Sequence, residues 1–125
     1  MHHRKLLVLL AAALIVATTP ASAVYNDNIT GHVVFVMQTT PGAGYVAETI
    51  QFKLDNMPAV TCIPGGFSQF GYSPSSVPDA QTRKNFLSLL LTAKASGATV
   101  TVAYDHNAGG FCDQGVYGIY YIVLN

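Results

Sequence analysis

A single stretch of this 125-residue chain, residues 80–96, has the pattern of an α-helix. Ser76 or Asp79 can cap its start, Pro78 suits a first helical turn, and Gly97 is placed to end it. The segments on both sides are rich in β-branched and aromatic residues, which favours strands. One helix among several strands restricts the chain to a mainly β fold or to a small α+β sandwich.

Three strands are expected before the helix and two after it: residues 29–37, 45–54, 59–63, 98–104 and 116–124. Residues 67–72 can continue the third strand after a bulge. The order strand, strand, strand, helix, strand, strand is that of the OB-fold, a five-stranded Greek-key barrel. We favour this barrel over a two-layer α+β sandwich because one helix is enough to plug one end of it.

The first 23 residues have the pattern of a secretory signal peptide of bacterial type. A positively charged start precedes an apolar run over residues 6–17, and small residues precede a cleavage site after Ala23. The run is shorter than the roughly twenty residues that a membrane-spanning helix needs. We therefore expect a mature protein of one domain, residues 24–125, that is secreted or periplasmic.

Cys62 and Cys112 are the only cysteines of the chain. An exported protein meets oxidising conditions, in which two such residues are expected to form a disulfide bond. This bond would close a loop of about fifty residues and stabilise the domain by roughly 4 kcal/mol. Two thiols outside a C-x-x-C pair are too few for a metal site, so we expect no metal and no cofactor.

The charge balance of the mature chain argues against nucleic-acid binding. Arg4 and Lys5 leave with the signal peptide, so four of the six basic residues remain against all six acidic ones. No basic patch is left to neutralise phosphate groups.

The sequence lacks the patterns of common catalytic sites. It contains no G-x-S-x-G, no H-E-x-x-H and no phosphate-binding loop. His32 and His106 are the only histidines outside the signal peptide. The spacing of Ser73, His106 and Asp113 does not support a Ser-His-Asp triad. We expect a protein that binds its target without catalysing a reaction.

The helix carries more apolar surface than one core requires. Its apolar residues cover an arc of roughly 200°, whereas about 100° is enough for a helix on a single core. These residues are Phe86, Leu87, Leu89, Leu90, Leu91 and Ala93. Either the helix is sunk between the end of the barrel and a long loop, or it packs on its own barrel and on a neighbouring subunit.

Seven tyrosines in a chain without tryptophan supply the chemistry of a binding surface. A tyrosine offers an apolar face and a hydroxyl, which suits both sugars and proteins, although many tyrosines simply pack within sheets. Tyr104 ends an expected strand and is followed by the polar Asp105 and His106. Because small barrels bind ligands at their rims, Tyr104 and Asp105 are candidate ligand-binding residues.

Three short motifs resemble the B subunits of subtilase-cytotoxin-type AB5 toxins. Residues 30–34, Thr-Gly-His-Val-Val, resemble the start of their first strand, and residues 59–62, Ala-Val-Thr-Cys, their cysteine-bearing strand. The most specific stretch is residues 96–104, Ser-Gly-Ala-Thr-Val-Thr-Val-Ala-Tyr, which resembles the turn after their helix and their fourth strand. A wider set of small exported bacterial proteins shares this pattern.

The resemblance implies an OB-fold subunit that forms a homopentamer and binds sialylated glycans of host cells, with a separate enzymatic A subunit as a further partner. It assigns glycan contacts to Thr30, where the family has a serine, and to Tyr104. An acidic residue shortly before that serine corresponds here to Asn26, with Asp27 beside it. The alternative is an exported protein-binding or inhibitor module with no toxin partner.

Overall fold

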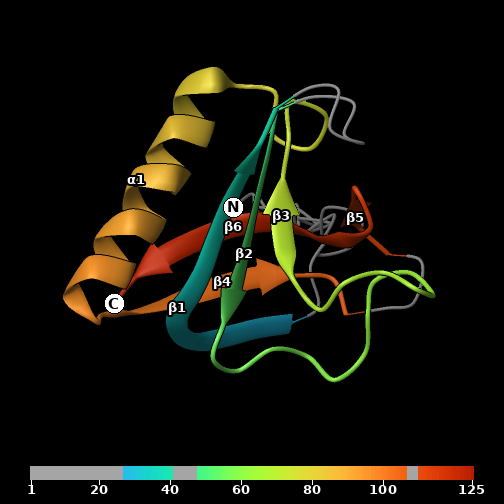
Figure 1. Cartoon of the computed structure of the whole chain (residues 1–125), viewed down its shortest axis with the longest axis horizontal. Helices are drawn as coiled ribbons and strands as arrows, with labels where there is room; N and C mark the ends of the chain where they lie inside the picture. The colour runs from blue at the N-terminus through green and yellow to red at the C-terminus, as the bar shows by residue number, and fades with distance from the viewer. Residues whose placement is uncertain (1–26, 41–47, 107–109) are drawn as a thin grey trace, which may run out of the picture.

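The computed structural model describes residues 27–40, 48–106 and 110–125 (Figure 1). The predicted signal peptide and its cleavage site lie outside these residues. Within them the chain forms one helix and six strands, which are β1 (Asp27–Thr39), β2 (Thr49–Leu54), β3 (Phe70–Tyr72), α1 (Ala80–Ser96), β4 (Thr99–Tyr104), β5 (Cys112–Asp113) and β6 (Val116–Leu124).

Five of the strands close into a ring. β1 pairs antiparallel with β2 on one side and with β4 on the other. β3 pairs antiparallel with β2 and parallel with β6, and β6 pairs antiparallel with β4. β5 extends this ring as a short hairpin partner of β6. The structure confirms the predicted mainly β, OB-type barrel, with its helix between the third and fourth strands.

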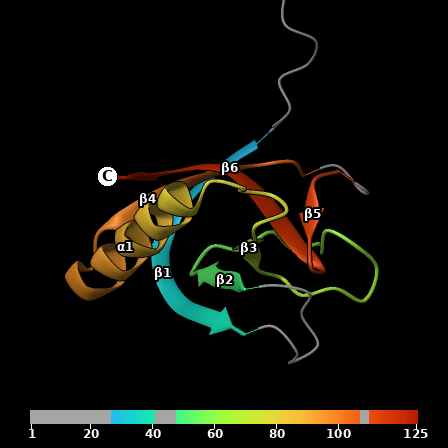
Figure 2. The same cartoon turned by 90° about the horizontal axis from the view of Figure 1, so that it is seen from above.

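β1 belongs to both halves of the barrel because it bends. Residues 27–32 pair with β4, and residues 33–39 pair with β2. The register shifts between Val33 and Phe35, so that Val34 is a bulge residue with a half-exposed side chain. Such a bulge bends a strand and increases its twist. Figure 2 shows the resulting curve of β1 around the barrel.

The third strand lies later in the chain than predicted. Residues 59–63 form no strand, and Phe70–Tyr72, expected only as a continuation, fills the place between β2 and β6. Cys62 is buried, whereas Val60 and Ile63 on either side are exposed. This segment therefore does not line the barrel, while all three residues of β3 are buried in it.

A short hairpin that was not predicted precedes the last strand. β5 and β6 are joined by Gln114 and Gly115, whose φ angles are 52° and 83°. Two consecutive residues with positive φ are typical of a type I′ turn, for which Asn-Gly is the usual signal. Glutamine at the first of these positions hides that signal in the sequence.

α1 has the predicted bounds and the predicted caps. Of the two candidates for its start, Asp79 is the residue used, since its Oδ2 accepts hydrogen bonds from the backbone N–H and the hydroxyl of Thr82 at 2.8 and 2.7 Å. Gly97 ends the helix at a φ of 74°, and its N–H donates to the carbonyl of Ala93. In the described part of the chain, no helix is long and apolar enough to span a membrane.

α1 packs against β1, β4 and β6 on the side of these strands that faces the core. Leu90 and Ala93 are buried in this contact, whereas Leu91 is 49% exposed. Three further apolar side chains are partly buried against the core: Phe86, Leu87 and Leu89. The helix is therefore not sunk into the fold, and its wide apolar arc leaves Leu91 available for a contact outside the subunit.

An aromatic cluster fills the barrel. The ring of Phe70 lies 5.5 Å from that of Phe52, 5.1 Å from Tyr104 and 6.1 Å from Tyr117, measured between ring centroids. All four side chains are at most 2% exposed. Tyr117 and Tyr104 thus belong to the core, as is usual for tyrosines in sheets.

The predicted disulfide bond between Cys62 and Cys112 is present. Cys62 lies in the irregular segment between β2 and β3, and Cys112 begins β5. The bond therefore attaches that segment to the β5–β6 hairpin, across 50 positions of the chain.

Candidate functional site

The outward side of β1, β4 and β6 carries a set of neutral polar side chains. Because side chains alternate along a strand, Val100, Val102 and Ile122 point into the core and the residues between them point outward. The strand register places Thr30 of β1 opposite Thr101 of β4. We call this set the outer polar face; its members are Asn28, Thr30, Thr99, Thr101, Tyr121 and Asn125.

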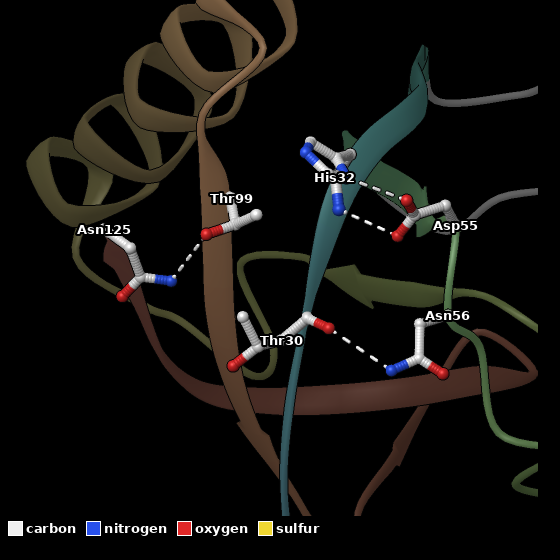
Figure 3. Close-up of polar contacts among 6 residues, drawn as sticks. All are labelled: Thr30, His32, Asp55, Asn56, Thr99 and Asn125. Atoms are coloured by element: carbon white, nitrogen blue, oxygen red, sulfur yellow. Dashed lines mark hydrogen bonds and ion pairs between the residues drawn. The ribbon is translucent and has the colours of Figure 1, made fainter.

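Hydrogen bonds connect the outer polar face from β1 to the end of β6. The hydroxyl oxygens of Thr30 and Thr101 lie 2.8 Å apart. The side-chain amide of Asn125 donates to the hydroxyl of Thr99 at 3.1 Å (Figure 3). It also donates to the hydroxyl of Thr101 at 3.2 Å. Hydroxyl and amide groups both donate and accept hydrogen bonds. This row of side chains can therefore exchange hydrogen bonds with the hydroxyls of a sugar.

Tyr121 and Asn28 extend the face by one more pair. The Tyr121 hydroxyl donates to Oδ1 of Asn28 at 3.0 Å, and the half-buried tyrosine ring adds apolar surface beside the polar row. All six residues of the face are uncharged. A ligand would be selected here by hydrogen bonds and apolar contact, with little contribution from ion pairs.

Asp55 and Asn56, which follow β2, form the edge of the face next to β1 (Figure 3). Asn56 Nδ2 donates to the carbonyl of Thr30 at 3.2 Å. Asp55 accepts from the backbone N–H of His32 at 2.8 Å, and its other oxygen lies 2.8 Å from His32 Nδ1. Gly31 permits this approach, because a Cβ there would lie 2.5 Å from Asp55 Oδ1. These contacts hold the strand that carries Thr30.

The contact between Asp55 and His32 predicts a pH dependence. Hydrogen bonds from the His32 side chain and backbone lower the pKa of Asp55 below its usual 3.8. A carboxyl group with a lowered pKa stabilises the fold above its unfolded-state pKa, and this contribution is lost as the pH falls through the folded-state pKa. Asp55→Asn should therefore unfold at a lower urea concentration than the wild type at neutral pH.

The difference between Asp55→Asn and the wild type should shrink as the pH falls from 3.8 through the lowered folded-state pKa of Asp55, because the carboxylate is then protonated and both side chains are neutral. Urea unfolding of the two proteins at a series of pH values measures it. A difference that stays constant with pH would contradict the role of the Asp55 charge.

Tyr104 lies at one end of the barrel, where β4 ends and β1 begins. Its ring is buried against Phe70 and Tyr117. Its hydroxyl donates to Asp27 Oδ2 at 3.3 Å and lies 3.1 Å from His106 Nδ1. Burial is the main cause that raises the pKa of Tyr104 to about 12, and the negative charge of Asp27 is the second. The hydroxyl therefore stays protonated at neutral pH and holds the exposed Asp27 carboxylate in place.

Of the five predicted ligand-binding residues, the structure brings Asp27 and Tyr104 together and places Thr30 apart from them. Asp27 and Tyr104 meet at the barrel end, whereas Thr30 lies about 10 Å further along β1, at the usual rise per residue, with its side chain on the opposite face of the strand. Asp105 follows Tyr104 and is half-buried. Asn26 lies outside the described residues. The predicted site thus forms two neighbouring groups, the outer polar face and the barrel end.

Thr99, Thr101 and Asn125 are members of the face that the sequence analysis does not indicate. For Thr99 and Thr101 the sequence gives one indication: threonine and valine alternate over residues 99–102, which predicts that one side of β4 is polar and faces outward. It does not reveal that this side adjoins Thr30, because that depends on the pairing of β4 with β1.

The residues considered for a catalytic triad do not form one. Ser73 Oγ donates to the buried Asp113 Oδ2 at 2.8 Å, while Nδ1 of His106 lies at the Tyr104 hydroxyl. In the described ranges of the chain, no three acidic, histidine or cysteine side chains are grouped as metal ligands.

The chain matches no protein-family model, no characterised protein and no solved structure. Its candidate function therefore depends on the geometry of the outer polar face and on the motifs described above.

Proposed function

We propose that the protein is a secreted, non-enzymatic carbohydrate-binding subunit that holds a cell-surface glycan, including sialylated ones, on the outer polar face. The observation that carries this proposal is the uncharged row of Thr30, Thr101 and Asn125, which is hydrogen-bonded across β1, β4 and the end of β6. Thr30 and Asn125 are exposed and Thr101 is half-buried. Strands hold these side chains in fixed positions, so that little order has to be created when a ligand binds.

Each contact of such a site contributes modestly, because a hydrogen bond to a sugar replaces one to water. The net contribution of a neutral hydrogen bond is about 1 kcal/mol. Several such contacts and one apolar surface, supplied here by Tyr121, are needed for useful affinity. Binding of several copies to one cell surface would raise the overall avidity further.

Thr30→Val tests the proposal, since valine has the same shape as threonine and lacks the hydroxyl. We expect this variant to bind its preferred glycan roughly fivefold more weakly than the wild type, measured on a glycan array and by calorimetry. The matched control is Thr92→Val on the exposed side of α1, which should bind as the wild type does. Equal binding by all three proteins, or no glycan bound by the wild type, would overturn the proposal.

Tyr104 and Asp27 have a second role in this proposal. Because the Tyr104 hydroxyl is bonded to Asp27, it positions an exposed carboxylate that can accept hydrogen bonds from a second sugar unit. Tyr104→Phe is therefore expected to weaken binding of extended glycans more than binding of single sugars.

The proposed subunit is one of five identical copies. The motif resemblance implies this assembly, and the exposed Leu91 gives α1 one apolar side chain that can contact a neighbouring subunit. Native mass spectrometry of the mature protein should show a species of five subunits, to which an enzymatic A subunit would attach. A monomer at micromolar concentration would contradict the assembly and leave the sugar site to be judged by the Thr30→Val experiment.

A second candidate function, an exported protein-binding or inhibitor module, is favoured by one other observation. Three apolar side chains of the segment between β2 and β3 are exposed, namely Val60, Ile63 and Phe67. Exposed apolar side chains in one loop are typical of protein contacts. Loss of function on replacing Phe67 with serine, with glycan binding unchanged, would favour this alternative.

A further inference from the structure

A cavity lies between the start of α1 and β6, and none of its lining residues belongs to the outer polar face. Its volume is about 360 Å³, within the usual range for small-molecule pockets, roughly 300 to 1,000 Å³. Three aromatic side chains, Phe86, Phe111 and Tyr120, line it together with Ser76 and Asp79.

The aromatic walls of the cavity are held by their neighbours. Phe111 and Tyr120 pack with their ring centroids 5.0 Å apart. The Phe111 ring also lies on the backbone of Gly118, where a Cβ would be 2.6 Å from it. The third ring, Phe86, meets Tyr72 edge-on with their ring centroids 5.4 Å apart. The rings therefore form a surface that exists before any ligand arrives.

A β-bulge directs Tyr120 into this wall. Ala103 of β4 pairs with Tyr121, and the next residue, Tyr104, pairs with Ile119. Tyr120 is therefore the extra residue of the bulge and does not follow the alternation that sends Tyr121 to the outer polar face. Bulges commonly re-aim side chains next to functional sites.

Two carboxylates and one guanidinium lie around the cavity. Asp79 lies at its rim, and the hydrogen bonds from the Thr82 hydroxyl and backbone lower the pKa of this carboxyl group. Asp113 lies behind Ser76, whose hydroxyl donates to it at 2.5 Å. The positive charge of Arg83 also lies close to this rim. Its Nη1 donates to the carbonyls of Val77 and Pro78 at 2.7 and 2.8 Å, and its charge helps to lower the pKa of Asp79, although Arg83 is not among the lining residues.

We propose that this cavity binds a small organic cation with an alkylammonium head. Aromatic rings attract a cation placed over their faces, and quaternary ammonium groups are recognised by clusters of such rings. The Asp79 carboxylate supplies the opposite charge at the rim. This site is independent of the proposed sugar site and uses none of its residues.

Choline is the probe, and its uncharged carbon analogue 3,3-dimethylbutan-1-ol is the matched ligand, because the two differ mainly in the charge. Titration of the whole mature protein, followed by amide shifts in NMR spectra, should show choline binding at least tenfold tighter than the analogue. Equal binding of the two, or no binding of choline, would overturn the proposal.

Asp79→Asn tests whether the Asp79 carboxylate attracts the cation to the cavity. Asparagine caps a helix as well as aspartate does, so α1 is kept while the rim loses its charge, and choline should bind about fivefold more weakly. Asp55→Asn removes an exposed charge elsewhere and should leave choline binding unchanged. Phe111→Leu should weaken binding of choline more than binding of the analogue. Unchanged choline binding in Asp79→Asn would contradict the proposal.

Discussion

Replacing both Cys62 and Cys112 with alanine is expected to lower the free energy of unfolding by about 4 kcal/mol. The bond joins residues 50 positions apart, and a loop of that length restricts the unfolded chain strongly. The loop contains β3, α1 and β4. Without the bond the unfolded chain has more conformational entropy, and more of it is lost when β3 pairs with β6 and closes the ring. Urea unfolding of the oxidised wild type and of the double variant measures the difference.

The matched comparison is the wild type after reduction of its disulfide under native conditions. It should lose about as much stability as the double variant, because both remove the same constraint from the unfolded state. A loss below about 1 kcal/mol in both would contradict the role assigned to the bond. A large loss in the double variant alone would mean that the substitutions themselves disturb the core around Cys62.

Phe70→Ala is expected to lower the free energy of unfolding by about 3–5 kcal/mol. The Phe70 ring is fully buried and packs against the rings of Phe52, Tyr104 and Tyr117. Because these rings belong to different strands, they cannot all move to fill the cavity that alanine would leave. Urea unfolding followed by far-ultraviolet circular dichroism gives the value.

Phe67→Ala is the control for this prediction. Phe67 lies three residues earlier and its side chain is 60% exposed, so its loss should cost under about 1 kcal/mol. If Phe70→Ala fails to fold, Phe70→Leu can replace it, because leucine keeps most of the side-chain volume. Phe70→Leu should lower the free energy of unfolding by less than Phe70→Ala and by more than the control Phe67→Ala. A similar decrease in the free energy of unfolding for Phe67→Ala and Phe70→Leu would contradict the role of Phe70 in stabilising the core.

The parts of the fold that depend on local signals could be predicted from the sequence. Asp79 and Gly97 bound the helix through interactions with residues three and four positions away, and such caps can be identified in a sequence. Alternation located β2 through Ile50, Phe52 and Leu54, all of which are buried. The OB-type order follows once the helix and most strands are placed.

The third strand could not be predicted because its place is decided by distant neighbours. Residues 59–63 have the composition of a strand, but the disulfide to Cys112 buries Cys62 and leaves the rest of the segment outside the barrel. Phe70–Tyr72 is too short to show a pattern, and it becomes a strand because β2 and β6 lie on its two sides. Pairing over such distances leaves little trace in a local pattern.

The candidate site can be predicted only in part, because the pairing of strands far apart in the chain brings its residues together. Thr30 was indicated by a motif at the start of β1, whereas its bond to Thr101 depends on the register of two strands far apart in the chain. The inward position of the Tyr104 ring was available from the sequence, because Val100, Val102 and Tyr104 alternate on one side of β4. That alternation places the ring in the core and leaves the hydroxyl at the barrel end.

The most direct test of the central claim is to map where a glycan touches the protein. The wild type would be titrated with the glycan that it binds best on an array, and backbone amide shifts would be recorded by NMR. The account predicts the largest shifts at Thr30, Thr101 and Tyr121, with small shifts on α1. Shifts confined to residues 60–67, or to the cavity beside Phe111, would contradict a sugar site on the outer polar face.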